Sequence, residues 1–262
     1  MKLSISNIAW FEQDDEMIYS FIKQNGFTGL EIAPTRIIKE NPYDELIKAR
    51  EWKNELIREY GFETPSMQSI WFGRSEKIFG SIEERKVLTD YTKKAIDWAE
   101  GVGIRNLVFG CPRNRVTAKD SDRQIGVTFF KELGDYANDH DCVIGMEANP
   151  PIYNTNYINN TASAIELIKE VDSEGFKLNL DVGTMINQGE DVSVIEDNVA
   201  LISHVHISEP GLAAIEKREL HGKLLKVLKE NGYERYVSIE MGNACGIDKV
   251  KEAIGYVAGL AN

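Results

Sequence analysis

Four strand-like stretches in the second half of the chain decide its fold: CVIGMEANPP (142–151), FKLNLDVGT (176–184), ISHVHISEP (202–210) and YVSIEMGN (236–243). Each is an apolar, β-branched run that ends at a turn signal, and helix-length segments separate them. Just before each turn stands an acidic or imidazole side chain; the four are Glu147, Asp181, His206 and Glu240. Because the strands of a parallel αβ barrel converge at their carboxyl ends, we predict that these side chains meet there.

The residue types in this set indicate a metal site. Three carboxylates brought together without a compensating basic cluster repel one another strongly unless a cation lies between them. We therefore predict that Glu147, Asp181, His206 and Glu240 surround a divalent metal ion.

Strand-like and helix-like segments alternate along the whole chain. The expected strands are 2–8, 28–33, 62–70, 104–110, 142–149, 176–183, 203–208 and 236–241, and the expected helices are 15–26, 44–61, 83–103, 122–140, 161–172, 191–200, 217–232 and 247–260. Eight such pairs indicate parallel crossovers that close into an α/β fold, the (β/α)8 TIM barrel, as a single domain over residues 1–262. Pro65 weakens the third strand. No GxGxxG motif follows the first strand, which argues against a doubly wound open sheet.

Charge and composition limit the partners and the location. The chain has 30 Lys and Arg against 42 Asp and Glu, a net charge of −12 that disfavours nucleic acid as a partner. Its three cysteines have no disulfide or zinc spacing, which indicates a reducing compartment. The amino terminus lacks the apolar region of a signal peptide, and no apolar run approaches the ~18 residues of a membrane span. We expect a cytoplasmic protein with no membrane partner.

The sequence around the four side chains resembles that of a known family. The strand ends contain GMEANP (145–150), LDVGT (180–184), HVHISE (204–209) and SIEM (238–241), and the first two strands contain LSISN and LEIA. In this order the motifs resemble the xylose isomerase-like TIM barrels, specifically the sugar phosphate isomerase/epimerase family. The resemblance implies that the four residues hold one divalent ion, Mn²⁺ first, with Mg²⁺, Co²⁺ or Zn²⁺ as alternatives. Three oxygen ligands and one nitrogen suit such ions.

The resemblance also implies a reaction, with Glu147 and Glu240 as the catalytic acid–base pair. One carboxylate removes the proton beside a carbonyl to give a cis-enediolate, and the other returns a proton from the opposite face. Such catalysis is worth roughly 10²–10⁴-fold in rate. The expected enzyme is a metal-dependent isomerase/epimerase of a small-molecule sugar or sugar derivative, in carbohydrate metabolism. A homo-oligomer would be ordinary for this family.

Two positions depart from the pattern of related epimerases. Thr184 stands three residues after Asp181, where the relatives usually have a histidine that touches the substrate. Leu212 stands six residues after His206, where a basic residue is frequent. The metal ligands are unaffected, but we expect a specificity unlike that of the free-ketohexose 3-epimerases.

Four further polar side chains are candidates for substrate binding: Glu31, Gln68, Glu209 and His221. Glu31 ends the second strand and Gln68 lies near the end of the third, where both could hydrogen-bond sugar hydroxyls or outer-shell ligands, with a core position as the alternative for Gln68. Glu209 could reach a substrate hydroxyl or merely precede the turn at Pro210. For His221, an ordinary position on a surface helix is an equal alternative. His204, by contrast, is expected to point to the opposite face of its strand from His206 and to pack outside the barrel.

Loop residues supply weaker candidates. Arg113 and Arg115 follow the fourth strand and are candidates to bind a phosphate or carboxylate, although solvated loop cations are the commoner case. Trp10, Trp71 and Phe72 are candidates to stack on a sugar, with core burial as the commoner alternative.

Three other functions compete with the isomerase. An inosose-type dehydratase, which is a lyase, needs the same metal and base, and the sequence does not separate it from the isomerase. An apurinic nuclease of the endonuclease IV type needs several extra histidines, whereas this chain has only four and a charge that opposes DNA binding. A non-catalytic binding protein predicts a damaged ligand set, and the set is complete.

Overall fold

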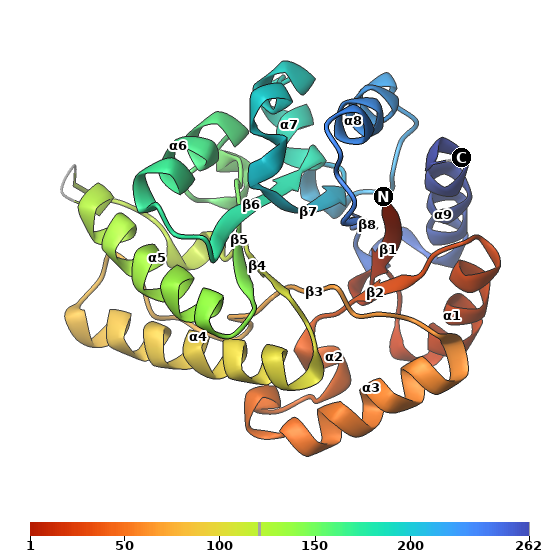
Figure 1. Ribbon diagram of the computed structural model, residues 1–262, viewed down its shortest axis with the longest axis horizontal. Helices are drawn as coiled ribbons and strands as arrows, with labels where there is room; N and C mark the ends of the chain where they lie inside the picture. Colours follow the sequence, from red (N-terminus) through yellow and green to blue (C-terminus); the bar gives the residue numbers. More distant parts are fainter. Residues whose placement is uncertain (120–121, 262) are drawn as a thin grey trace.

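A computed structural model describes residues 1–119 and 122–261. Eight parallel strands form a nearly closed barrel in the order β2-β1-β8-β7-β6-β5-β4-β3 (Figure 1). Their bounds are β1 (Lys2–Ser6), β2 (Gly29–Glu31), β3 (Ser66–Met67), β4 (Asn106–Phe109), β5 (Val143–Glu147), β6 (Phe176–Asp181), β7 (Ile202–Ile207) and β8 (Tyr236–Ile239). The expected (β/α)8 TIM barrel is therefore confirmed.

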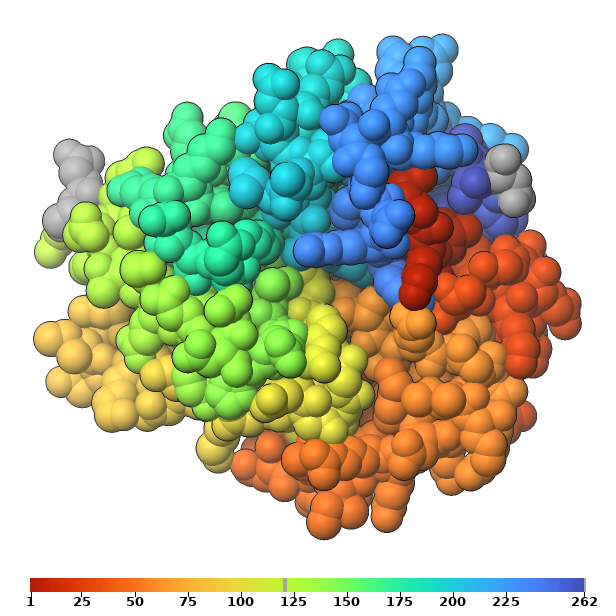
Figure 2. All heavy atoms as spheres, viewed as in Figure 1, coloured from red at the N-terminus to blue at the C-terminus, as the bar shows by residue number. Residues whose placement is uncertain are grey.

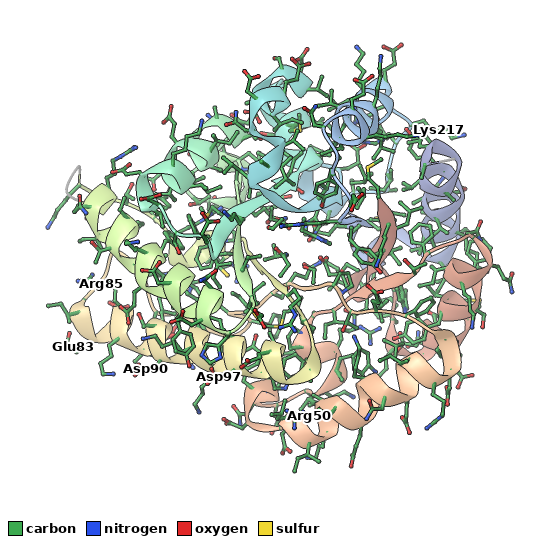
Figure 3. The ribbon with its side chains drawn as sticks, in the orientation of Figure 1. Arg50, Glu83, Arg85, Asp90, Asp97 and Lys217 are labelled. Atoms are coloured by element: carbon green, nitrogen blue, oxygen red, sulfur yellow. The ribbon has the colours of Figure 1, made fainter. Side chains whose placement is uncertain are left out.

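Helices between the strands cover the outside of the barrel (Figure 1). They are α1 (Asp15–Gln24), α2 (Pro34–Ile37), α3 (Leu46–Tyr60), α4 (Ile82–Val102), α5 (Asp122–Asp139), α6 (Thr161–Val171), α7 (Val182–Gln188), α8 (Glu219–Glu230) and α9 (Ile247–Ala261). Charged side chains such as Glu83, Asp90 and Asp97 lie on the exposed side of α4 (Figure 3). Among the described residues, none of these helices has the length and apolar character that crossing a membrane requires.

The barrel is weakest between β2 and β3, as Pro65 suggests. The strand β3 has only two residues and begins directly after this proline, which has no N–H to donate to a neighbouring strand. Two isolated bridges, Gly29 to Glu63 and Ile32 to Met67, join the two strands and bring the barrel close to closure.

The connection after β6 differs from the prediction. The segment 191–200 forms short 3-10 turns, and the α-helix α7 begins instead directly after Asp181, the last residue of β6. The Asp181 carboxylate accepts a hydrogen bond from the backbone N–H of Thr184, at 2.6 Å, and so caps this helix. One residue thus ends a strand and starts a helix without an intervening loop.

The inside and the outside of the barrel differ in chemistry. Side chains alternate along each strand, so that on β1 Leu3 and Ile5 face the helices while Ser4 and Ser6 face the barrel axis. The same alternation runs through the other strands. Fully or almost fully buried polar side chains therefore line the axis: Ser4, Ser6, Glu31, Ser66, Gln68, Asn106, Asn179, His204, His206 and Ser238. The large apolar core lies between the sheet and the helices.

Candidate metal centre

The barrel brings the four predicted ligands together at the carboxyl ends of β5 to β8. Glu147 and Asp181 are the last residues of their strands, His206 is the next-to-last residue of β7, and Glu240 directly follows β8. One ligand atom from each lies within 4.8 Å of those of the other three. The Nδ1 atom of His206 is 3.0 Å from Glu147 Oε1 and 3.4 Å from Glu240 Oε2. Such a group of three carboxylates and one imidazole could bind a metal ion.

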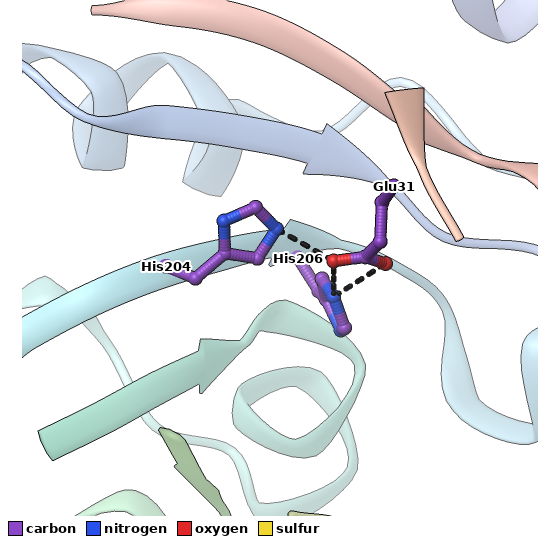
Figure 4. A group of neighbouring side chains, drawn as sticks. All are labelled: Glu31, His204 and His206. Atoms are coloured by element: carbon purple, nitrogen blue, oxygen red, sulfur yellow. Dashed lines mark hydrogen bonds and ion pairs between the residues drawn. The ribbon is translucent and has the colours of Figure 1, made fainter. Parts of the chain in front are cut away.

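A second carboxylate holds the other side of the His206 ring. Glu31, on β2, is fully buried, and its two oxygens lie 3.0 and 3.1 Å from His206 Nε2 (Figure 4). A carboxylate that accepts the Nε2–H fixes the ring and leaves Nδ1 directed at the other three ligands. Glu31 therefore lies behind a ligand rather than on the open side of the site.

The placement of His204 corrects the prediction for this residue. Residues two apart on a strand share one face, so His204 points into the barrel like His206, and the two rings are 5.3 Å apart between centroids. Its Nε2 lies 2.8 Å from Glu31 Oε2 (Figure 4), which is an ion-pair distance, but the contact does not have the geometry of a hydrogen bond. Glu31 thus lies between two imidazoles.

Burial and mutual repulsion shift the ionisation of the cluster. Burial raises the pKa of Glu240 to about 7 and that of Asp181 to about 6, and in both cases the neighbouring carboxylates add to the increase. Burial alone would lower the pKa of His206, but the negative charges of Glu31 and Glu240 raise it well above its usual value. For Glu31 the effect of burial is overcome by the two histidines, and its pKa lies well below the usual range.

These shifts show that the residues fit a cation. Two of the carboxylates resist ionisation where they are, and the His206 imidazolium is the positive charge that offsets the others. A divalent ion at the centre of the set would favour the ionised carboxylates and replace the proton on Nδ1. No cysteine is part of the cluster, which argues against a closed structural zinc site. Its hard oxygen ligands suit an ion such as Mn²⁺ or Mg²⁺.

Several residues that support the ligands were not predicted. Asn179 and Asn149 donate to the two oxygens of Glu147, at 3.0 and 3.1 Å. The Ser208 hydroxyl donates to Asp181 Oδ2. Asn179 stands two residues before Asp181, and Ser208 stands two residues after His206. The rule that residues two apart share a strand face was the signal that could have identified both.

A cavity of about 220 Å³ opens over the cluster and is lined by its three carboxylates. Gln68, Glu209 and Leu212 also line it. Three non-glycine residues on its wall have left-handed backbone: Ser69, Cys111 and Leu212, with φ of 56°, 46° and 56°. Such conformations cost about 1–3 kcal/mol each and are concentrated at functional sites.

The two candidates that line the cavity, Gln68 and Glu209, already have protein partners. Arg218 donates to both Glu209 oxygens, at 2.7 Å each, so Glu209 is neutralised beside the cavity. Gln68 donates to Ser6 and to Glu31, which places it between the deeper carboxylate and the cavity. His221 lies in the first turn of α8 and is buried, its Nδ1 lies 3.1 Å from the hydroxyl of Tyr256 on α9, and it does not line the cavity.

The loop candidates lie away from the cavity. Arg115 is completely buried and donates to the Glu147 carbonyl and to Asn149 Oδ1, so it supports a ligand from behind. Arg113 is exposed. Trp10 and Trp71 are core residues, and Phe72 is 70% exposed. None of these five lines the cavity. Arg115 is buried because it donates to the carbonyl of Glu147, 32 residues away. Its local sequence does not reveal this partner.

The protein is an eight-stranded parallel barrel with carboxylates and a histidine at the carboxyl ends of its strands. In barrels of this class the active site lies at that end. The family model described as xylose isomerase-like TIM barrel matches residues 19–259. The chain therefore belongs to the xylose isomerase-like TIM barrel family, as predicted. No curated protein sequence matches the chain.

Solved structures with the same fold include sugar epimerases and a dehydratase. 3-Keto-D-glucoside 4-epimerase YcjR from E. coli is 21% identical, with a TM-score of 0.78 over 99% of this chain and 98% of that one. D-psicose 3-epimerase from Clostridium cellulolyticum H10 is 16% identical, with a TM-score of 0.78 over 98% and 96%. The probable 3-DHS dehydratase AsbF from Bacillus anthracis is 19% identical, with a TM-score of 0.72 over 99% and 98%.

Proposed function

We propose that this protein is a divalent-metal-dependent epimerase or isomerase of an uncharged sugar or sugar derivative. The observation that carries the proposal is the convergence of Glu147, Asp181, His206 and Glu240 on one point at the floor of a small cavity. The sugar epimerases among the structural neighbours support the assignment.

The four converging residues would hold the metal, with Mn²⁺ as the first candidate. When bound, the ion supplies Lewis-acid stabilisation of negative charge that develops on substrate oxygens. The protein residues supply the remaining chemistry. Asn149 and Asn179 hold the two oxygens of Glu147, and Glu31 fixes the ring of His206.

Glu147 and Glu240 are the proposed proton-transfer pair. They enter the cavity from β5 and from β8, with β6 and β7 between them, so a sugar carbon between the two carboxylates has one on each side. One carboxylate takes the proton beside the substrate carbonyl, and the other returns a proton to the opposite face.

Metal uptake is the first test. We expect about one Mn²⁺ per chain, because the cluster has four ligands around one point. Binding must displace protons from Asp181, Glu240 and His206, whose pKa values are all raised, so affinity should rise with pH. Isothermal titration should show at least about a tenfold gain between about pH 5.5 and about pH 7.5. No uptake at either pH would refute the metal site.

The substrate is proposed to be uncharged because no cation lines the cavity. Among the described residues that form its wall there is no lysine, arginine or histidine, while the three cluster carboxylates are present. A phosphate or carboxylate group on the substrate would face like charges, which costs several kcal/mol.

Turnover of neutral and charged sugars tests this assignment. With Mn²⁺ present, kcat/KM for a neutral ketose should exceed that for its phosphate ester by about 100-fold or more, since like-charge contacts of several kcal/mol act only on the ester. The same mixtures, examined by NMR in deuterated water, distinguish an epimer carrying solvent deuterium from a dehydrated product. Exclusive loss of water would assign the chain to the dehydratases, which the similarity to AsbF brings into consideration. Preference for the ester would contradict the uncharged substrate.

A further inference from the structure

A second and larger cavity lies at the opposite end of the barrel from the metal cluster. It has a volume of about 620 Å³ and is formed where the strands begin, by residues such as Lys2, Asn106, Val143 and Tyr236. Figure 2 views this end, which is hollowed beside the red amino-terminal residues. The proposed function uses none of this cavity.

The charges on its wall are unusual for this acidic chain. The lining cations are Lys2, Lys53, Arg105 and Arg235, and the lining carboxylates are Glu63, Asp141 and Glu234. Lys2 is paired with Glu63, at 3.2 Å. Among the described residues, none of the other three cations has a carboxylate within 4.0 Å, although ion pairs are frequent elsewhere on the surface. Three unpaired positive charges thus border one hollow.

Lys53 is the most constrained of these cations. It projects from α3, is partly buried, and donates to the hydroxyl of Thr64, a residue only 2% exposed. Burial lowers the pKa of this ammonium group to about 8, and the nearby Glu63 only partly counteracts the shift. A desolvated ammonium without an anionic partner is a group that gains from binding an anion.

The floor of the cavity offers a neutral polar group as well. Asn106 is 4% exposed and donates to the Ser66 hydroxyl at 2.9 Å, while its Oδ1 has no hydrogen-bond partner. The amide can therefore bind a hydroxyl group that enters from the cavity. The wall thus combines unpaired cations near the opening with a buried amide at depth.

From these features we propose that the amino-terminal end of the barrel is a binding site for a small phosphate-bearing metabolite, held by Lys53, Arg105 and Arg235. Two guanidinium groups and an ammonium match the charge and the several acceptor oxygens of a phosphate group better than those of a single carboxylate. The hydroxylated part of the ligand would reach Asn106. The proposal is independent of the proposed function, since it uses the opposite end of the barrel and none of the proposed metal ligands.

The test is a calorimetric titration of the full chain with inorganic phosphate, with acetate at matched ionic strength as the carboxylate comparison. We expect saturable binding of phosphate and weaker binding of acetate. Lys53→Met should weaken phosphate binding by at least about tenfold, which corresponds to about 1.4 kcal/mol. Lys229→Met is the matched control and should bind like the wild type, because Lys229 is exposed on α8 and forms no ion pair with any residue that the structure describes.

Each outcome decides the proposal. Arg235→Gln, at an exposed position, should also weaken phosphate binding. Circular dichroism would show whether Lys53→Met folds, and if it does not, Arg235→Gln replaces it as the test variant. An absence of saturable binding by the wild type would overturn the site. Equal binding by the wild type and Arg235→Gln would place the phosphate elsewhere and overturn it too. Tighter binding of acetate than of phosphate would overturn the ligand class.

Discussion

Glu240→Gln is expected to lower the rate of sugar epimerisation by about 10²–10⁴-fold, the usual contribution of a general acid or base. The glutamine keeps the size of the side chain and an oxygen for the metal, but it cannot exchange a proton. Glu147→Gln should show a loss of the same order, since the reaction needs one carboxylate on each side of the carbon. The measurement is initial rate with a neutral ketose and saturating Mn²⁺, together with metal content for each variant.

Isotope exchange separates a proton-transfer role from a purely metal-binding one. With one carboxylate left, each single variant should still exchange the α-proton of one substrate epimer with deuterated solvent, and the two variants should act on opposite epimers. Glu230→Gln, at an exposed position on α8, is the control and should keep full activity. Loss of bound metal in both single variants, with no exchange of either epimer, would argue that the two glutamates serve only as ligands.

Glu31→Gln should weaken Mn²⁺ binding by about 10–100-fold, the usual effect of removing the partner that orients a ligand histidine. The carboxylate accepts from His206 Nε2 and raises the basicity of the ring, whereas a neutral amide stabilises neither the charge nor the orientation as well. Affinity is measured by titration calorimetry, and the free energy of unfolding by urea denaturation. Glu63→Gln, at the other end of the barrel, is the control.

Metal affinity and unfolding free energy distinguish two roles for Glu31. A fall in unfolding free energy of the metal-free protein with unchanged metal affinity would make Glu31 only a structural partner of the two histidines. Because the pKa of Glu31 is held well below its usual range, its contribution to stability is present at neutral pH and is lost as the pH falls through that lowered value. The comparison therefore belongs near neutral pH, where the carboxylate is ionised.

The sequence was sufficient for the barrel and for the convergence of Glu147, Asp181, His206 and Glu240, because both follow from the alternation of strands and helices and from where each strand ends. Their roles in binding metal and moving protons stay predictions. The connection after β6 was missed because Asp181 both ends the strand and caps α7, so no loop separates the two patterns.

Other features depend on contacts between distant residues. The packed tertiary structure sets the pairing of Glu209 with Arg218, the burial of Arg115 behind Glu147 and the contact of His221 on α8 with Tyr256 on α9. Residue type and spacing carry no record of such partners. The prediction for His204 was wrong for a different reason: residues two apart on a strand share one face, and this rule, correctly applied, would have placed His204 beside His206.

The polar lining of the barrel axis has a consequence for how this protein can change. The apolar area that holds the fold together lies in the outer layer, where the strands meet the helices. Substitutions along the axis therefore alter hydrogen bonding and charge with little loss of hydrophobic burial, whereas substitutions in the outer layer alter stability. Site chemistry and stability thus depend on alternate residues of the same strands. Selection or engineering can therefore change the chemistry at the carboxyl end of the barrel while the scaffold stays intact.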